Sequence, residues 1–216
     1  MTKEKILERL VKIQIGEGSY FDMGLYRELI HDIEQDIREE NNKARGLGNL
    51  NKLAKAIFKS APVNNEMMQY ANTVNGVQYV LDGYRIAGFY NALDLPEWSD
   101  TKDPRPFFDI VKILDGVEYD DEAPLELPAV SELKAEIKLA KAKNPKKHCF
   151  IWKFENGPAV NAQFLLDFMQ AYTDMRIYAS AINKLTYPLY IESEYGMGIL
   201  LPIKCTDEMR TGLSVQ

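Results

Sequence analysis

The residues best suited to catalysis are few, and their spacing does not form a catalytic centre. His148 and Cys149 are adjacent, in a segment that reads as a strand over residues 148–154. Successive side chains of a strand point to opposite faces, so these two cannot hydrogen bond as a base and a nucleophile. A buried cysteine beside a surface histidine is the simpler interpretation, and His31 lies on a charged helix face where solvent would surround it. We therefore expect no catalytic residues and a protein that is not an enzyme.

The pattern for a metal or phosphate site is also missing. Structural zinc sites use about four closely spaced Cys or His ligands, whereas the chain has two of each. The acidic run at residues 120–122 lacks the ordered spacing of a calcium loop, and we interpret it as a solvated turn. The glycines of residues 46–48 follow a helical segment rather than a strand, which indicates a linker between helices and not a phosphate-binding loop. We expect no metal and no cofactor.

Basic side chains recur at helical spacing in two segments of a chain whose net charge is −6. Residues three or four apart share one helix face, so each lysine group could meet DNA phosphates together. The candidates for contact with double-stranded DNA are Lys52, Lys55, Lys59, Lys134, Lys138 and Lys141. The alternative is an ordinary solvated helix face. The acidic net charge argues against a protein that coats nucleic acid with its whole surface, so any binding is expected to be weak and independent of sequence.

A helix followed by a three-stranded meander is expected from residue 49 onward. Apolar residues at helical spacing predict a helix over residues 50–58, which Pro62 terminates. Strand-like runs follow at residues 67–74, 77–81 and 84–90. The dipeptides Asn75-Gly76 and Asp82-Gly83 separate these runs and favour the positive φ angles of tight hairpins.

The same order recurs later in the chain. A helix is predicted over residues 162–172, with Asn161 as its N-cap. Strand-like runs follow at residues 175–182, 187–192 and 197–204. An internal repeat constrains the whole architecture. The sequence therefore predicts an α+β fold made of two helix-plus-antiparallel-sheet halves.

Two further regions lie outside the repeat. Residues 1–48 are expected to form an N-terminal helical arm, with helices over residues 2–15 and 25–45. Residues 91–158 are expected to form an irregular insert within a domain that spans residues 49–216. Within the insert we expect a hairpin over residues 107–119, a helix from Ser131 to Lys143, and the strand at residues 148–154.

One segment has a specific resemblance. The stretch Ala159-Val-Asn-Ala-Gln-Phe-Leu-Leu-Asp-Phe-Met-Gln-Ala-Tyr172 resembles the entry to the last helix of the bacterial DNA sliding clamp, the β subunit of the replicative polymerase, where Phe-Asn-x-x-Tyr-Leu-Leu-Asp-x-Leu is typical. Tyr187-Pro-Leu-Tyr-Ile191 is similar to the penultimate strand of that family, and residues 198–204 are similar to its terminal strand. A full clamp subunit has three such domains, and this chain has room for one.

The resemblance implies a clamp-like scaffold of the kind used in DNA replication. In that family the terminal strand of the last domain helps to form an apolar groove for short peptides of partner proteins. Matched residue by residue, this role would fall to Ile199, Leu201, Pro202 and Ile203. Alternation in a strand would place the two isoleucines and the leucine on one face. The alternative is that they fill the domain core.

The function expected from this resemblance is a non-enzymatic, DNA-associated or partner-docking protein. The rival hypothesis is a small regulatory or interaction protein, such as one from a mobile element, that uses a clamp-like scaffold without binding DNA. No apolar run approaches the roughly 20 residues that span a bilayer, and two cysteines favour a reducing compartment, so we expect a cytoplasmic protein. In the clamp family, six such modules form a ring around DNA. The arm and the insert would obstruct the edges through which such a ring closes, so we expect a monomer or a dimer.

Overall fold

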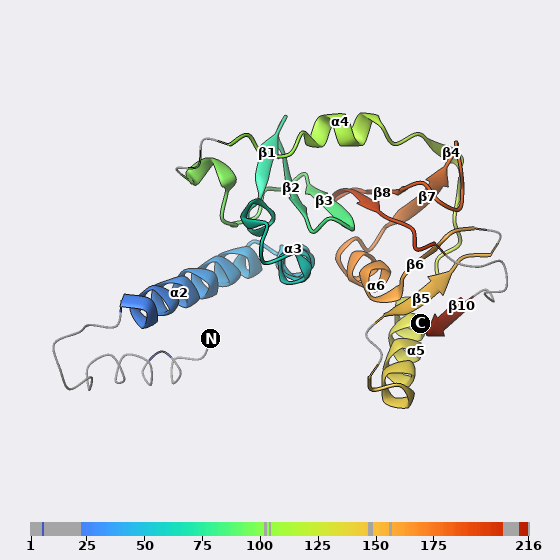
Figure 1. Ribbon diagram of the computed structural model, residues 1–216, viewed down its shortest axis with the longest axis horizontal. Helices are drawn as coiled ribbons and strands as arrows, with labels where there is room; N and C mark the ends of the chain where they lie inside the picture. The colour runs from blue at the N-terminus through green and yellow to red at the C-terminus, as the bar shows by residue number, and fades with distance from the viewer. Residues whose placement is uncertain are drawn as a thin grey trace. The chain divides into compact units, whose positions relative to one another are not determined.

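The computed structural model describes residues 6, 23–101, 103, 105–146, 149–155, 157–204 and 212–215, and these form an α+β fold (Figure 1). The chain divides into two compact units, residues 1–48 and residues 49–216. The first unit contains helix α2 (Met23–Ala44), which agrees with the helix predicted over residues 25–45. The helix predicted over residues 2–15 lies outside the described residues, apart from Ile6. No helix in the described ranges is long and apolar enough to cross a bilayer.

The second unit is organised around one antiparallel sheet. Its seven strands lie in the order β1-β2-β3-β9-β8-β7-β4. They are β1 (Asn72–Val74), β2 (Val77–Leu81), β3 (Arg85–Phe89), β4 (Tyr119–Pro124), β7 (Arg176–Ser180), β8 (Leu189–Ser193) and β9 (Gly196–Leu200). Asn75, Gly76 and Gly83 have positive φ angles, as the hairpin dipeptides predict.

The sheet is assembled from two meanders that meet in its middle. Helix α3 (Gly48–Ser60) precedes β1-β2-β3, and helix α6 (Ala162–Ala171) precedes β7-β8-β9. The meanders join where β3 pairs antiparallel with β9, with Arg85 opposite Leu200 and Phe89 opposite Gly196. Each half therefore consists of one helix followed by three strands of a continuous sheet. This is the order that the sequence predicts twice.

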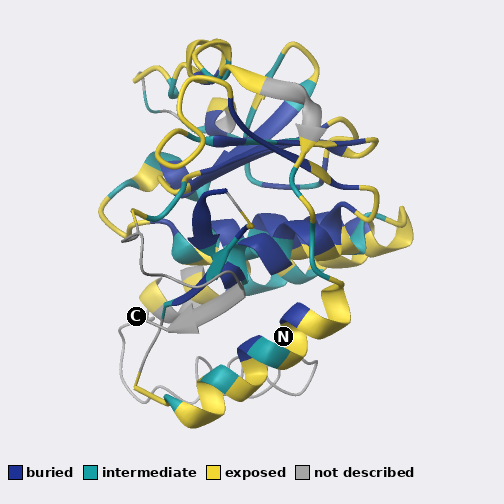
Figure 2. Cartoon of the chain, turned by 90° about the vertical axis from the view of Figure 1, so that its right-hand side faces the viewer, coloured by how far each residue is buried: buried dark blue, intermediate teal, exposed yellow. Residues whose placement is uncertain are grey.

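Helices α3 and α6 lie on one face of this sheet (Figure 1). The Asn161 side chain caps α6 by accepting hydrogen bonds from Gln163 N and Phe164 N, as predicted. Just beyond α6, Tyr172 is almost fully buried, and its hydroxyl donates to Gly88 O at 2.9 Å. The face of α6 toward the sheet is buried, as is most of β3 and β9 (Figure 2). We call α3 and α6, together with helix α5 (Val130–Lys143), which packs against α6, the helix layer.

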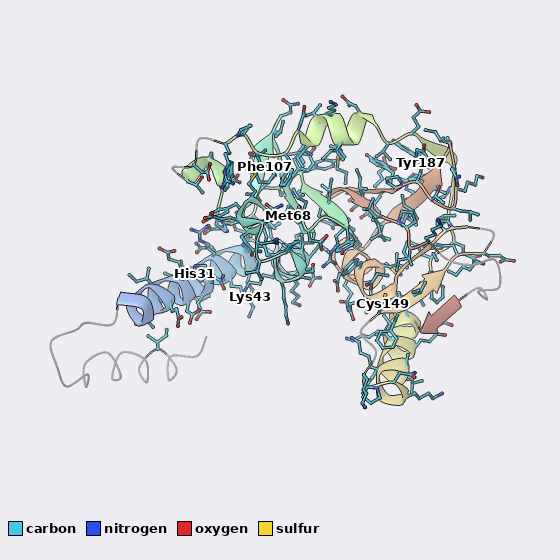
Figure 3. The ribbon with its side chains drawn as sticks, in the orientation of Figure 1. His31, Lys43, Met68, Phe107, Cys149 and Tyr187 are labelled. Carbon is cyan, nitrogen blue, oxygen red and sulfur yellow. The ribbon has the colours of Figure 1, made fainter. Side chains whose placement is uncertain are left out.

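The opposite face of the sheet, here the outer face, is covered in part by helix α4 (Ile110–Asp115). The hairpin predicted over residues 107–119 is therefore wrong. The Asp109 side chain accepts a hydrogen bond from Lys112 N and caps the helix, and Ile110 is buried against the sheet. Met68 and Phe107 lie over the same half of the sheet (Figure 3). The segment is helical because Asp109 caps its first turn and because the helix buries Ile110 against the sheet.

The strand predicted over residues 67–74 is mostly wrong. Residues Glu66–Gln69 form a short 3-10 helix, η1, and within the predicted run the strand β1 covers only Asn72–Val74. Two turn hydrogen bonds close η1, from Met68 N to Asn65 O and from Tyr70 N to Met67 O. The turn brings Met68 into the apolar cluster on the outer face. Burial of that side chain outweighs the local preference for a strand.

A smaller sheet completes the second unit. Its order is β10-β5-β6, from β5 (Phe150–Lys153), β6 (Ala159–Asn161) and β10 (Gly212–Val215). Helix α5 (Val130–Lys143) lies beside it, and Leu133 and Ile137 are its buried residues. Ala129, rather than Ser131, occupies the N-cap position of α5. Residues 120–122 lie in β4 and not in a turn. A further 3-10 helix, η2 (Trp98–Asp100), interrupts the proline-rich loop.

Candidate docking groove

An apolar groove of about 260 Å³ opens on the outer face, between α4 and the turn that joins β2 to β3. The sheet supplies its floor through Leu81, Ile86 and Ile199, which point to the same face because Ile86 pairs with both neighbours in register. The walls come from separate elements of the chain: Tyr84, Ile113, Val117, Pro188 and Leu201. The volume is below the roughly 300–1,000 Å³ of pockets for small molecules. A groove of this size and apolar lining has room for single apolar side chains.

The walls of the groove are exposed although its floor is buried. Ile199 is only 2% exposed, whereas Ile113 is 41%, Leu201 is 38% and Tyr84 is 59% exposed. A contiguous patch of exposed apolar side chains often marks an interaction surface, whereas single exposed apolar residues are common on any protein. The groove therefore exposes a contiguous apolar surface to solvent.

The four residues predicted to line a peptide groove divide into two pairs. Ile199 and Leu201 both line the groove. Strand β9 ends at Leu200, so residues 201–204 do not continue its alternation. Ile203 instead forms a bridge with Ala159 of β6, donating its N–H to Ala159 O at 2.7 Å. The prediction that Ile199, Leu201 and Ile203 share one strand face is therefore wrong, and Pro202 and Ile203 lie outside the groove lining.

The turn at one end of the groove is held by a buried ionic network. Asp82 is fully buried and accepts hydrogen bonds from Tyr84 N and Arg85 N at 2.9 Å each. The Arg85 guanidinium reaches the helix layer, where it binds Asp82 at 2.8 Å and Asp167 of α6 at 2.7 Å. It also donates to Ala56 O and Ser60 Oγ of α3. The network fixes Tyr84 as a wall and ties the β2–β3 hairpin to both helices.

The ring of Phe164 completes the packing of this network. The Arg85 guanidinium lies 4.1 Å from the centre of the ring, within the range of a cation–π contact. Tyr84 lies 6.3 Å from the same ring. Sequence reasoning did not identify Arg85 as important, although an arginine inside the apolar run of residues 84–90 was a signal of a buried ion pair.

The predicted DNA-contact lysines are carried by α3 and α5. Lys52 and Lys59 are exposed and Lys55 is half-buried, and the three lysines of α5, Lys134, Lys138 and Lys141, are exposed. Lys141 Nζ donates to Gln163 Oε1 of α6 at 3.0 Å. Gln163 in turn donates to Asp167. A cavity of about 370 Å³ lies in the helix layer, and Lys52 and Asp167 are among its lining residues.

Of the adjacent His148 and Cys149, the structure describes only the cysteine. His148 lies outside the described residues, and burial raises the pKa of the Cys149 thiol, which disfavours a reactive thiolate. Within the described ranges, no group of three or more His, Cys, Asp or Glu side chains could hold a metal ion.

Comparisons with known proteins yield no match. No family model fits the chain, and no curated protein or solved structure is significantly similar to it.

Proposed function

We propose that this chain is a non-enzymatic docking protein on a clamp-like scaffold, and that its outer groove binds a short apolar segment of a partner protein. The observation that supports this function is the open apolar wall of the groove above a buried apolar floor, with Leu201 and Ile113 at its mouth. The buried network around Arg85 holds the turn at Tyr84 in place before a peptide arrives. A preformed groove reduces the ordering cost of binding.

The test uses the full chain and fluorescent pentapeptides with Leu or Phe at alternate positions in a polar background. Fluorescence polarisation should give dissociation constants in the range of about 1–100 μM for such weak, small interfaces. The variant Leu201→Asp introduces a charge at the groove mouth, and we expect it to weaken binding more than about tenfold. Leu139→Asp is the matched control, because Leu139 is 60% exposed on α5 and lies outside the groove lining.

Two results would count against the proposed groove. One is equal binding by the chain and by Leu201→Asp. The other is the absence of binding by every peptide at about 1 mM, a concentration that reveals interactions of about 4 kcal/mol. Serine in place of the Leu and Phe anchors should abolish the signal in all variants.

A second candidate function is association with double-stranded DNA through the helix layer. The exposed lysines of α3 and α5 support it, because lysines that repeat along a helix can neutralise several phosphates. The rival hypothesis remains a small regulatory or interaction protein that uses the scaffold without DNA. The docking function is compatible with both.

A further inference from the structure

A second surface on the outer face has a different chemistry from the groove. We call it the tyrosine patch, and it consists of Tyr90, Tyr119, Tyr178, Tyr190 and Glu192. In the sheet register, Tyr178 is opposite Tyr190, and Tyr190 is opposite Ile199. The two tyrosines therefore point to the outer face, on the half of the sheet away from β1 and β2.

Three rings of the tyrosine patch contact one another, and one of them binds the Glu192 carboxylate. Tyr119 stacks on Tyr190 with ring centres 4.1 Å apart and planes 10° apart. Tyr119 also contacts Tyr178 at 5.5 Å. The Tyr178 hydroxyl donates to Glu192 Oε2 at 3.1 Å. These contacts fix the aromatic faces and the carboxylate relative to one another.

The tyrosine patch is open to solvent. Tyr90 is 44% and Tyr119 is 38% exposed, and the Glu192 carboxylate is on an exposed residue. Burial raises the pKa of Tyr90 and Tyr190, and nearby Glu192 raises both further. The rings therefore stay neutral and keep their negative π faces at any physiological pH.

Charge decides which partner fits. A carboxylate beside aromatic faces attracts a cation, and a guanidinium combines stacking on a ring with hydrogen bonds to a carboxylate. Arg176, opposite Glu192 in register, already interacts with Tyr178 from within the chain.

We propose that the tyrosine patch binds an arginine side chain presented by a basic segment of a partner protein. Arg stacks on the solvent-exposed part of the Tyr119 ring and donates to Glu192. The site is independent of the apolar groove, and its partner segment is basic rather than apolar. A partner that carries both kinds of segment would engage the outer face at two points.

The test is a titration of the ¹⁵N-labelled full chain with the capped peptide Gly-Gly-Arg-Gly-Gly, followed by NMR. The matched ligand replaces arginine by citrulline, which has the same shape and no charge. We expect saturable shift changes confined to β4, β7, β8 and the residues around Tyr90, with citrulline binding about tenfold more weakly.

Variants connect the signal to the patch. Tyr119→Ala removes the stacked ring from an irregular edge strand, and Glu192→Gln removes the charge but keeps an acceptor for Tyr178. Each should weaken binding about fivefold or more. Tyr187→Ala is the control, because Tyr187, which Figure 3 labels, is an exposed tyrosine (43%) and is not one of the five patch residues. Thermal melts check that the variants remain folded.

The proposal is overturned by any of three results. These are equal affinity for the arginine and citrulline peptides, shift changes that map outside the patch or do not saturate, and unchanged affinity in both patch variants. Preferential binding of an oligothymidine to the same residues would assign the patch to base stacking and would also overturn it.

Discussion

At the scale of single residues, the Arg85 side chain links the β2–β3 hairpin to helices α3 and α6. Its side chain is 1% exposed and that of Asp82 is 0% exposed. A buried ion pair adds little net stability compared with an apolar replacement, but removal of one partner leaves an uncompensated charge in the interior. Arg85 therefore specifies how the hairpin and both helices meet, more than it adds to the total stability.

Arg85→Met should reduce the free energy of unfolding by about 3–5 kcal/mol, because Asp82 stays buried without its cation. Urea denaturation followed by circular dichroism measures the loss. The matched control is Arg105→Met, which breaks the exposed pair with Asp103 and should shift the midpoint far less. A double variant, Arg85→Met with Asp82→Asn, should recover part of the loss. Equal midpoints for Arg85→Met and Arg105→Met would refute the role of the network.

We expect Tyr172 to make the free energy of unfolding fall as the pH rises into the alkaline range. Burial, with a smaller contribution from Tyr90, raises the pKa of the Tyr172 hydroxyl above its usual 10.0. The folded protein therefore keeps a proton that the unfolded chain loses near pH 10, so this stability is complete below about pH 10 and is lost as pH rises. We expect Tyr172→Phe to lower stability by about 1 kcal/mol at neutral pH, since its bond to Gly88 O is lost.

The same variant should also lose stability less steeply between about pH 9 and pH 11. Urea midpoints across that range compare the two proteins. Burial also raises the pKa of Tyr79, Tyr178 and Tyr190, so part of the alkaline slope should remain. Parallel curves for the two proteins would show that Tyr172 does not titrate differently in the folded and unfolded states.

At the scale of elements, the seam between β3 and β9 depends on small residues. A Cβ at Gly196 would collide with the carbonyl of Gly88 and lie 2.9 Å from the Tyr172 hydroxyl. A Cβ at Gly198 would lie 2.8 Å from Phe168 and 3.0 Å from Ile86 O. The two halves of the sheet join closely because β9 has no side chains at these positions.

Gly196→Ala should therefore destabilise the protein by about 1–3 kcal/mol or more, because backbone atoms must move to admit the methyl group. Gly48→Ala is the matched control: no atom lies within 4 Å of the added Cβ, and its position at the start of α3 favours alanine by about 0.4–1 kcal/mol. Thermal melts of both variants test the seam. A neutral Gly196→Ala would mean that the strands separate without cost.

At the scale of the whole molecule, the proposed association with DNA is expected to depend on the lysines of α5. The triple variant Lys134→Glu, Lys138→Glu and Lys141→Glu should abolish any mobility shift with duplex DNA at low salt, since phosphate contacts release counterions. The control reverses Lys112, Lys184 and Lys204, which are exposed and lie outside α3 and α5. It changes the net charge equally and should leave binding in place. Absence of a shift with the unaltered chain would eliminate the DNA function.

Assembly is the second property of the whole molecule. Closure of a ring by modules of this size would require a cyclic oligomer with heterologous contacts. We expect a monomer or a dimer, and size exclusion with light scattering measures the mass. A stable hexamer would contradict the expectation and favour a ring.

The amino-acid sequence determined the elements that local chemistry can specify. Asn161 caps α6, the Asn75-Gly76 and Gly83 turns have positive φ, and the helix-plus-three-strands order occurs twice, as predicted. Helix periodicity, capping and hairpin turns act over a few residues, so one sequence contains the information for each of them.

Tertiary structure decided the rest, because those features depend on contacts between distant residues. Residues 107–115 are apolar enough for a strand, but the Asp109 cap and the docking of Ile110 on the sheet make residues 110–115 helical. Leu201 lines the groove, but Ile203 does not, because the backbone at Ile203 pairs with Ala159 of β6. The ionic network of Arg85 and the stacked tyrosines join elements far apart in sequence, and only packing brings their charges and rings together.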